Sequence, residues 1–149
     1  MLLIDPGASA RHARRMLTGR CLCGTIRYAI DGDIGPIAFC HCAECRRASG
    51  SAFAANANVA AAEHRVTGGA EAVVEYESSP GKVRAFCGCC GSPMYSRTAA
   101  EPAVLRIRLG TLDQDPGGRP RLHVWTSEKA AWFEINDDLP RIDAIPRPG

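Results

Sequence analysis

Residues 87–91 read Cys-Gly-Cys-Cys-Gly, and this stretch decides the fold together with the short motif Cys21-Leu22-Cys23. Cys87 and Cys90 have the two-residue separation of a zinc knuckle, and the glycine after each of them allows a tight backbone. Cysteines this close rarely bond to each other, and their spacing directs both sulfurs at one shared ion. A four-thiolate ion joining the two stretches would hold the first strand region against a hairpin more than 60 residues later in the chain. We therefore expect metal binding to contribute to folding itself.

A third cluster, Cys40-His41-Cys42-Ala43-Glu44-Cys45, offers three thiols and no obvious fourth ligand. Three protein ligands with one exchangeable position are typical of a catalytic zinc. Three thiolates make the ion a weaker Lewis acid than three histidines do, and a soft site suits an incoming thiol. The pattern therefore favours a thiol substrate over hydrolysis. We expect the side chains of His41 and Cys89 to point away from the metal ions.

The composition is that of one soluble domain. The chain has 149 residues, 46% hydrophobic and 23% charged, with a formal net charge of +2. That charge is too small to indicate nucleic-acid binding, and no apolar run approaches the roughly 20 residues of a membrane helix. Residues 1–15 lack the apolar region of a signal peptide, which predicts a cytoplasmic protein whose thiols stay reduced. Metal ligation is then favoured over a disulfide framework or an iron–sulfur cluster, while a purely structural zinc ribbon stays open.

The hydrophobic pattern predicts an all-β domain of short strands with few helical turns. Strands are expected at residues 24–30, 37–40, 53–59, 73–76, 82–86, 104–109 and 122–125. Single helical turns are expected at 43–48 and at 127–132, the second with Ser127 as its N-cap. Trp125, Trp132 and Phe133 are expected in the core.

Several polar residues near the third cluster could have either a functional or a purely structural role. Arg46 and Arg47 follow Cys45 directly and could bind a substrate carboxylate, or they could form a solvated basic turn. Glu44 could act as a base, although an exposed turn carboxylate is the plainer reading. His123 is expected to be a hydrogen-bonded core histidine.

These motifs resemble those of one known family. Residues 18–28, Thr-Gly-Arg-Cys-Leu-Cys-Gly-Thr-Ile-Arg-Tyr, are similar to the opening motif of the glutathione-dependent formaldehyde-activating (GFA) family, which shares its domain with centromere protein V. Residues 39–50 and 86–91 resemble its second and third motifs. The chain is also similar to the family's C-terminal signature, at residues 110–113, 123–125, 132 and 138–140.

The resemblance implies a β-tent of small antiparallel sheets with zinc-bearing knuckles over residues 17–142. Residues 1–16 would then be a flexible N-terminal extension, and residues 143–149 a C-terminal tail. It also implies two zinc ions per chain, one structural and one catalytic. The structural ion would be bound by Cys21, Cys23, Cys87 and Cys90, and the catalytic ion by Cys40, Cys42 and Cys45.

The implied activity is that of a carbon–sulfur lyase similar to S-(hydroxymethyl)glutathione synthase. Such an enzyme reversibly joins a glutathione-like thiol to formaldehyde or a related small aldehyde. The expected partners are these small molecules, with no nucleic acid and no membrane. The alternative is a non-catalytic zinc module that binds a protein or nucleic acid, and the arginines that favour it are at positions 11, 14, 15, 46 and 47.

Overall fold

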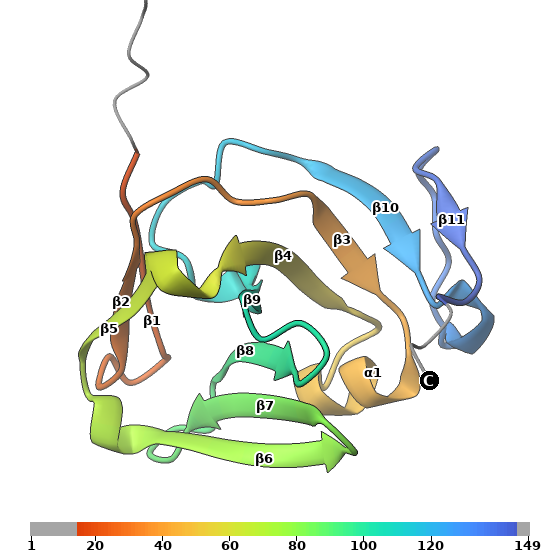
Figure 1. Ribbon diagram of the computed structural model, residues 1–149. Coiled ribbons are helices and arrows are strands. Elements are labelled where there is room, and N and C mark those ends of the chain that lie inside the picture. The colour runs from red at the N-terminus through yellow and green to blue at the C-terminus, as the bar shows by residue number, and fades with distance from the viewer. Residues whose placement is uncertain (1–14, 146–149) are drawn as a thin grey trace, which may run out of the picture.

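The computed structural model describes residues 15–145 and consists mainly of strands, which confirms the all-β class (Figure 1). A three-stranded antiparallel sheet has the order β1-β2-β5. Its strands are β1 (Leu17–Arg20), β2 (Arg27–Ile30) and β5 (His64–Gly68). The predicted boundary between an N-terminal extension and the domain stays a prediction, because residues 1–14 lie outside the described residues. The same holds for residues 146–149 of the predicted tail.

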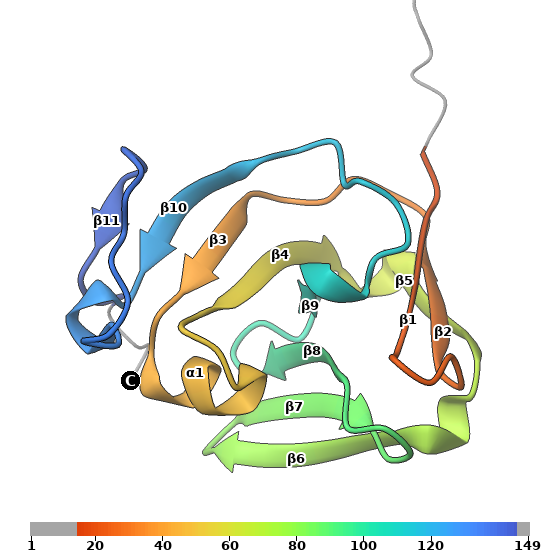
Figure 2. The same cartoon turned by 180° about the vertical axis from the view of Figure 1, so that it is seen from behind.

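The second sheet has eight strands in the order β11-β10-β3-β4-β9-β8-β7-β6. Their bounds are β3 (Ile37–Cys40), β4 (Ala54–Ala60), β6 (Val73–Ser79), β7 (Lys82–Cys87), β8 (Pro93–Thr98), β9 (Val104–Arg108), β10 (Pro120–Val124) and β11 (Arg141–Ile142). All neighbours pair antiparallel except β10, which runs parallel to both β3 and β11. Figures 1 and 2 show these strands following one another in an arc, with α1 between the β3–β4 and β6–β7 parts of it.

Helical structure is sparse, as predicted. Within residues 15–145 the one α-helix is α1 (Ala43–Ser49), at the position expected for a helical turn. The 3₁₀ turns are η1 (Ala61–Glu63), η2 (Ala70–Ala72), η3 (Leu109–Thr111) and η4 (Thr126–Glu128). The predicted turn with Ser127 as N-cap is wrong, because η4 follows Trp125 and has no side-chain cap. The Ser127 hydroxyl instead donates to the Asp143 carbonyl at 2.6 Å.

Two clusters of buried side chains form the interior. The larger one includes Ile26, Ile30 and Ile107, which are 1%, 0% and 0% exposed, and it also contains Cys21 and Cys87. The smaller one surrounds the third cysteine cluster and includes Ala54 and Val124, with Trp125 packed against it. Trp132 was expected in the core, but it is 73% exposed because it lies in a segment without strand or helix. None of the helices in the described range has the length and apolar character needed to cross a membrane.

Candidate metal centres

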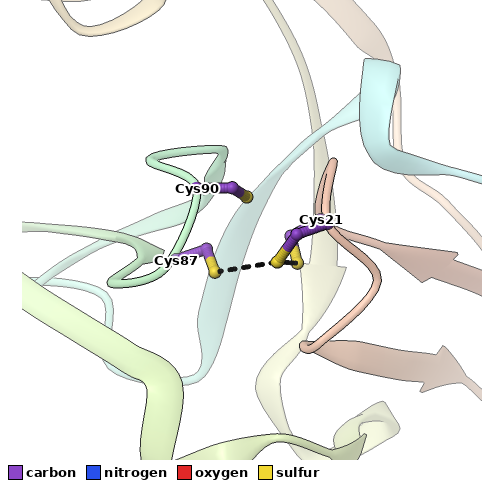
Figure 3. Close-up of side chains that lie close together, drawn as sticks. Cys21, Cys87 and Cys90 are labelled. Carbon is purple, nitrogen blue, oxygen red and sulfur yellow. Dashed lines mark hydrogen bonds between the residues drawn. The ribbon is translucent and has the colours of Figure 1, made fainter.

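The first centre joins two turns that lie far apart in the sequence. Cys21 and Cys23 lie in the turn between β1 and β2, while Cys87 ends β7 and Cys90 lies in the turn before β8. Their four Sγ atoms lie within 4.8 Å of one another. In Figure 3 the sulfurs of Cys21, Cys87 and Cys90 converge on one another from the two turns. The expected pairing of the first and last cysteine stretches is therefore present in the geometry.

The sulfur separations in this centre fit a tetrahedral ion. Zinc–thiolate bonds of about 2.3 Å place neighbouring sulfurs about 3.8 Å apart in a tetrahedron. The Sγ atoms of Cys21 and Cys23 are 3.5 Å apart, and those of Cys23 and Cys87 are 3.9 Å apart. A disulfide would need about 2.05 Å, and all eight cysteines are free thiols. Cys89 is exposed and lies outside this group of four.

Backbone and hydroxyl groups fix the two turns. The Ile26 N–H donates to Cys21 Sγ at 3.3 Å, and the Leu22 N–H donates to Ser92 Oγ of the opposite turn at 2.8 Å. Gly91 has a φ of +78°, and its N–H donates to the Cys87 carbonyl at 2.8 Å, which closes the second turn. The Ser92 hydroxyl and N–H lower the pKa of Cys90 to about 5. The contacts from Ile26 and Ser92 favour the thiolate form that a metal requires, while the pKa values of Cys21 and Cys87 stay raised, with burial contributing to both.

The second centre is built by the end of β3 and the start of α1. Cys40 ends the strand, and Cys42 is the N-cap of the helix, where its sulfur accepts from the Cys45 N–H at 3.3 Å. The three Sγ atoms lie within 4.8 Å of one another. No fourth His, Cys, Asp or Glu joins this group within residues 15–145. Cys40 and Cys45 are buried, so the sulfurs face the interior rather than bulk water.

Two arginines that were not predicted as site residues approach this second centre. Arg84 Nη1 lies 3.9 Å from Cys45 Sγ, and Arg84 Nη2 donates to Glu44 at 3.0 Å. Hydrogen bonds with Cys40 and Cys42 lower the pKa of Cys45. The positive charges of Arg84 and Arg108 lower it further. The site therefore stabilises negative charge on Cys45, while hydrogen bonding to neighbouring cysteines and burial raise the pKa of Cys40 and Cys42.

A buried chain of hydrogen bonds lies behind the cysteine turn. His41 Nε2 is 2.8 Å from His123 Nδ1, and His123 Nε2 is 3.0 Å from Asp137 Oδ2. The Asp137 carboxylate can only accept, so the tautomer of His123 that fits these contacts donates from Nε2 and accepts from His41 at Nδ1. Both rings are buried, which agrees with the expectation for His123, and the His41 side chain faces His123. This chain fixes the residue between Cys40 and Cys42.

Arg46 and Arg47 occupy the last turn of α1. Arg47 is exposed, and the Nε atom of Arg46 is buried without a hydrogen-bond partner in the described part of the chain. Their predicted role in substrate binding stays a prediction.

The surface of residues 15–145 includes the following two hollows. A pocket of 190 Å³ lies between α1 and the large sheet, and its lining includes Ala48, Tyr76, Arg84, Phe86 and Arg108. A larger hollow of 360 Å³ lies against the three-stranded sheet and has no cysteine in its lining. The lining of the smaller pocket contains no cysteine either, but it includes Arg84, whose Nη1 lies 3.9 Å from Cys45 Sγ. The smaller pocket is therefore the one next to the second centre.

Comparison with known proteins supports the sequence motifs. The model of the glutathione-dependent formaldehyde-activating enzyme family matches residues 16–128. A crystal structure of a Rhodobacter sphaeroides protein superposes with a TM-score of 0.54 at 24% sequence identity, over 69% of this chain and 91% of that chain. This likeness shows the fold alone. The comparison with curated proteins gave no match.

Proposed function

We propose that the chain, which belongs to the glutathione-dependent formaldehyde-activating enzyme family, is a zinc-dependent carbon–sulfur lyase. Its reaction is the reversible addition of a glutathione-like thiol to formaldehyde or a related small aldehyde. Family membership supports glutathione-dependent formaldehyde activation in general terms. The lyase reaction and the roles of individual residues are our proposal.

The observation that carries this proposal is the difference between the two cysteine centres. The first centre has four sulfurs, which complete a tetrahedral ion and leave no position open. We assign it a structural role, because Cys21 and Cys23 on one side and Cys87 and Cys90 on the other join the two sheets. Among residues 15–145 the second centre has only Cys40, Cys42 and Cys45, so an ion held by these three would keep one exchangeable position.

The groups around Cys40, Cys42 and Cys45 suit thiol chemistry. A zinc ion bound there would supply a position at which the substrate sulfur is held as a thiolate. Arg84 places positive charge 3.9 Å from Cys45 Sγ, which limits the charge that builds up when another thiolate joins three. The hydrogen-bonded His41 and His123 hold the turn between Cys40 and Cys42 in place.

The chemical step joins the substrate sulfur to the aldehyde carbon. The thiol releases its proton, the S–C bond forms, and the carbonyl π electrons move to oxygen, which takes up a proton to give the hydroxymethyl thioether. The reverse reaction breaks the same S–C bond. We also propose a cytoplasmic location, because clustered metal-ligating thiols suit a reducing compartment.

Exchange NMR on formaldehyde and glutathione at equilibrium tests the proposed reaction. Zinc-loaded protein should accelerate exchange between free glutathione and its hydroxymethyl adduct. The Cys42→Ala variant should lose one ion and this acceleration, while Cys89→Ala, which changes an exposed thiol outside both centres, should keep both. An exchange rate equal to that of the uncatalysed reaction, with both centres loaded, would contradict the proposal.

A further inference from the structure

Cationic side chains gather on one face of the large sheet. Residues paired directly across strands point to the same face. Arg84 of β7 is opposite Ser96, Ser96 is opposite Arg106 of β9, and Arg108 is opposite Asn56 of β4. Asn56 shares its face with Ala54, which is the partner of Cys40. The arginines and the second cysteine centre therefore lie on the same side of the sheet.

Arg84 and Arg106 each have an acidic partner. Arg84 pairs with Glu44 at 3.0 Å, and Arg106 forms an ion pair with Glu101. Burial tends to lower the pKa of Arg84, but the contacts with Glu44 and Cys45 outweigh burial and raise it. The charge of Arg84 is thus compensated within the protein.

Arg108 has no carboxylate partner of this kind among the described residues. It is 6% exposed, and in the described part of the chain no carboxylate lies within ion-pair distance of it. Its Nη1 donates to Asn56 Oδ1 at 2.6 Å, but its Nε is buried without a partner. Burial lowers the pKa of Arg108, and the attraction of Cys45, Cys40 and Cys42 does not offset this. A buried cation without a counter-charge is costly unless an anion joins it.

The pocket beside α1 gives an anion access to this region. Arg84 and Arg108 are both in its lining, and Tyr76 and Phe86 supply apolar walls. A guanidinium binds a carboxylate through two parallel hydrogen bonds, and the surrounding rings would strengthen that attraction by excluding water. The 190 Å³ volume admits a small carboxylate-bearing group.

The local charges also leave room for an anion. On this side of the sheet Arg84 and Arg106 pair with Glu44 and Glu101, while Lys82 and Arg108 have no ion-pair partner among the described residues. Three thiolates with one divalent ion would add one negative charge. That single charge would offset only one of the two unpaired cations, and Arg108 is the more deeply buried of them.

We propose that Arg108, with Arg84 beside it, forms a subsite for a carboxylate of the thiol substrate in the pocket between α1 and the large sheet. This inference rests on the proposed function, since it assumes that the substrate sulfur binds at Cys40, Cys42 and Cys45. It names the substrate class as a thiol that carries a carboxylate a few bonds from its sulfur. Arg108 is a binding residue in this scheme.

A pair of small thiols tests the subsite. Cobalt-loaded protein is titrated with 3-mercaptopropionate, which has a carboxylate, and with 2-mercaptoethanol, which has none, and the cobalt absorption bands report each Kd. The charged thiol should bind about tenfold more tightly or better, as expected for charge-assisted hydrogen bonds. Arg108→Gln should remove this preference, because it should weaken binding of 3-mercaptopropionate by about tenfold more than it weakens binding of 2-mercaptoethanol. Arg106→Gln, a cation on the same strand and face that already pairs with Glu101, should keep the preference.

The following results would overturn the proposed carboxylate subsite. Equal affinity of the two thiols for the unaltered protein would contradict the subsite. An equal loss of both affinities in Arg108→Gln would also contradict it, because Arg108 would then act only as a charge partner of the metal-binding thiolates. Should Arg108→Gln fail to fold, acetate competition on the unaltered protein decides the matter, since acetate must weaken binding of 3-mercaptopropionate alone. Catalysed exchange of formaldehyde with 2-mercaptoethanol would show that the proposed function stands even where the subsite fails.

Discussion

Replacing Gly19 by alanine should destabilise the protein because Tyr28 fills the space that a Cβ would need. An ideal Cβ on Gly19 would lie 2.2 Å from Tyr28 Cζ and 2.3 Å from its Oη, well inside van der Waals contact. The ring is held in place, since Tyr28 is 2% exposed, its hydroxyl lies 2.7 Å from Thr111 Oγ1, and it stacks on His64 at a centroid distance of 5.0 Å.

The expected magnitude follows from two costs. Forcing an extra methyl into a packed site costs about 1–3 kcal/mol. Displacing the Tyr28 hydroxyl from Thr111 costs about 1 kcal/mol more. The free energy of unfolding of Gly19→Ala should therefore fall by about 2–4 kcal/mol, a large share of the roughly 5–15 kcal/mol of a typical domain.

Urea unfolding of the zinc-loaded protein at a fixed free zinc concentration measures this change. Gly68→Ala is the matched control in the same sheet, because a Cβ there meets no atom within 4 Å, and its effect should stay within about 0.5 kcal/mol. Tyr28→Val makes room for the methyl, so Gly19→Ala combined with Tyr28→Val should cost at least about 1 kcal/mol less than the two single changes summed. Additive costs, or a Gly19→Ala variant as stable as the control, would refute the steric argument.

Three further changes test other parts of the structure. Cys87→Ser should remove one of two bound ions and lower the free energy of unfolding, whereas Cys89→Ser should keep both ions; metal analysis and urea unfolding distinguish them. Burial lowers the pKa of His64 below 6.5, so its contribution to stability is complete above pH 6.5 and is lost as the pH falls toward the lowered value. The stability difference between the unaltered protein and His64→Phe should therefore shrink from pH 7.5 to pH 5.5, and a constant difference would contradict this. His123→Leu should cost about 1–3 kcal/mol because it leaves the buried His41 Nε2 without its partner, and an unchanged urea midpoint would show that the pair adds nothing.

The joining of the cysteine stretches could be predicted from the sequence, because metal-ligand spacing is visible within a few residues, while the shared ion connects segments far apart in the chain. The two-residue gap between Cys87 and Cys90 requires a turn, and a four-thiolate ion requires a second pair such as Cys21 and Cys23. The structure places all four sulfurs within 4.8 Å of one another. Strands with clear alternation, such as β7 and β9, were also predicted close to their observed bounds.

The arginines beside the second centre could not be predicted in the same way. Alternation along residues 82–86 and 104–109 shows that Arg84 and Arg108 share a face with other polar residues. Which face of the sheet α1 covers depends on strand order and register, which the local pattern does not contain. Strands β1, β5 and β8 were missed because their short stretches mix glycine, proline and charged residues with few apolar ones.

The exposed position of Trp132 and the buried histidine pair have a similar cause. A tryptophan near the C-terminus is expected in the core by its size alone, but no strand or helix of the described range includes its segment. His41 and His123 meet because β3 and β10 lie side by side in parallel, a pairing between segments about 80 residues apart. Tertiary contacts of this kind decide both placements.

Cobalt spectroscopy with glutathione tests the central claim most directly, namely that Cys40, Cys42 and Cys45 hold an ion with an open position. The protein should bind two cobalt ions, and glutathione should change the bands of one of them. Cys42→Ala should abolish that change and Cys89→Ala should preserve it. A spectrum of two bound ions that glutathione leaves unaltered would mean that both centres are closed, and would contradict the account.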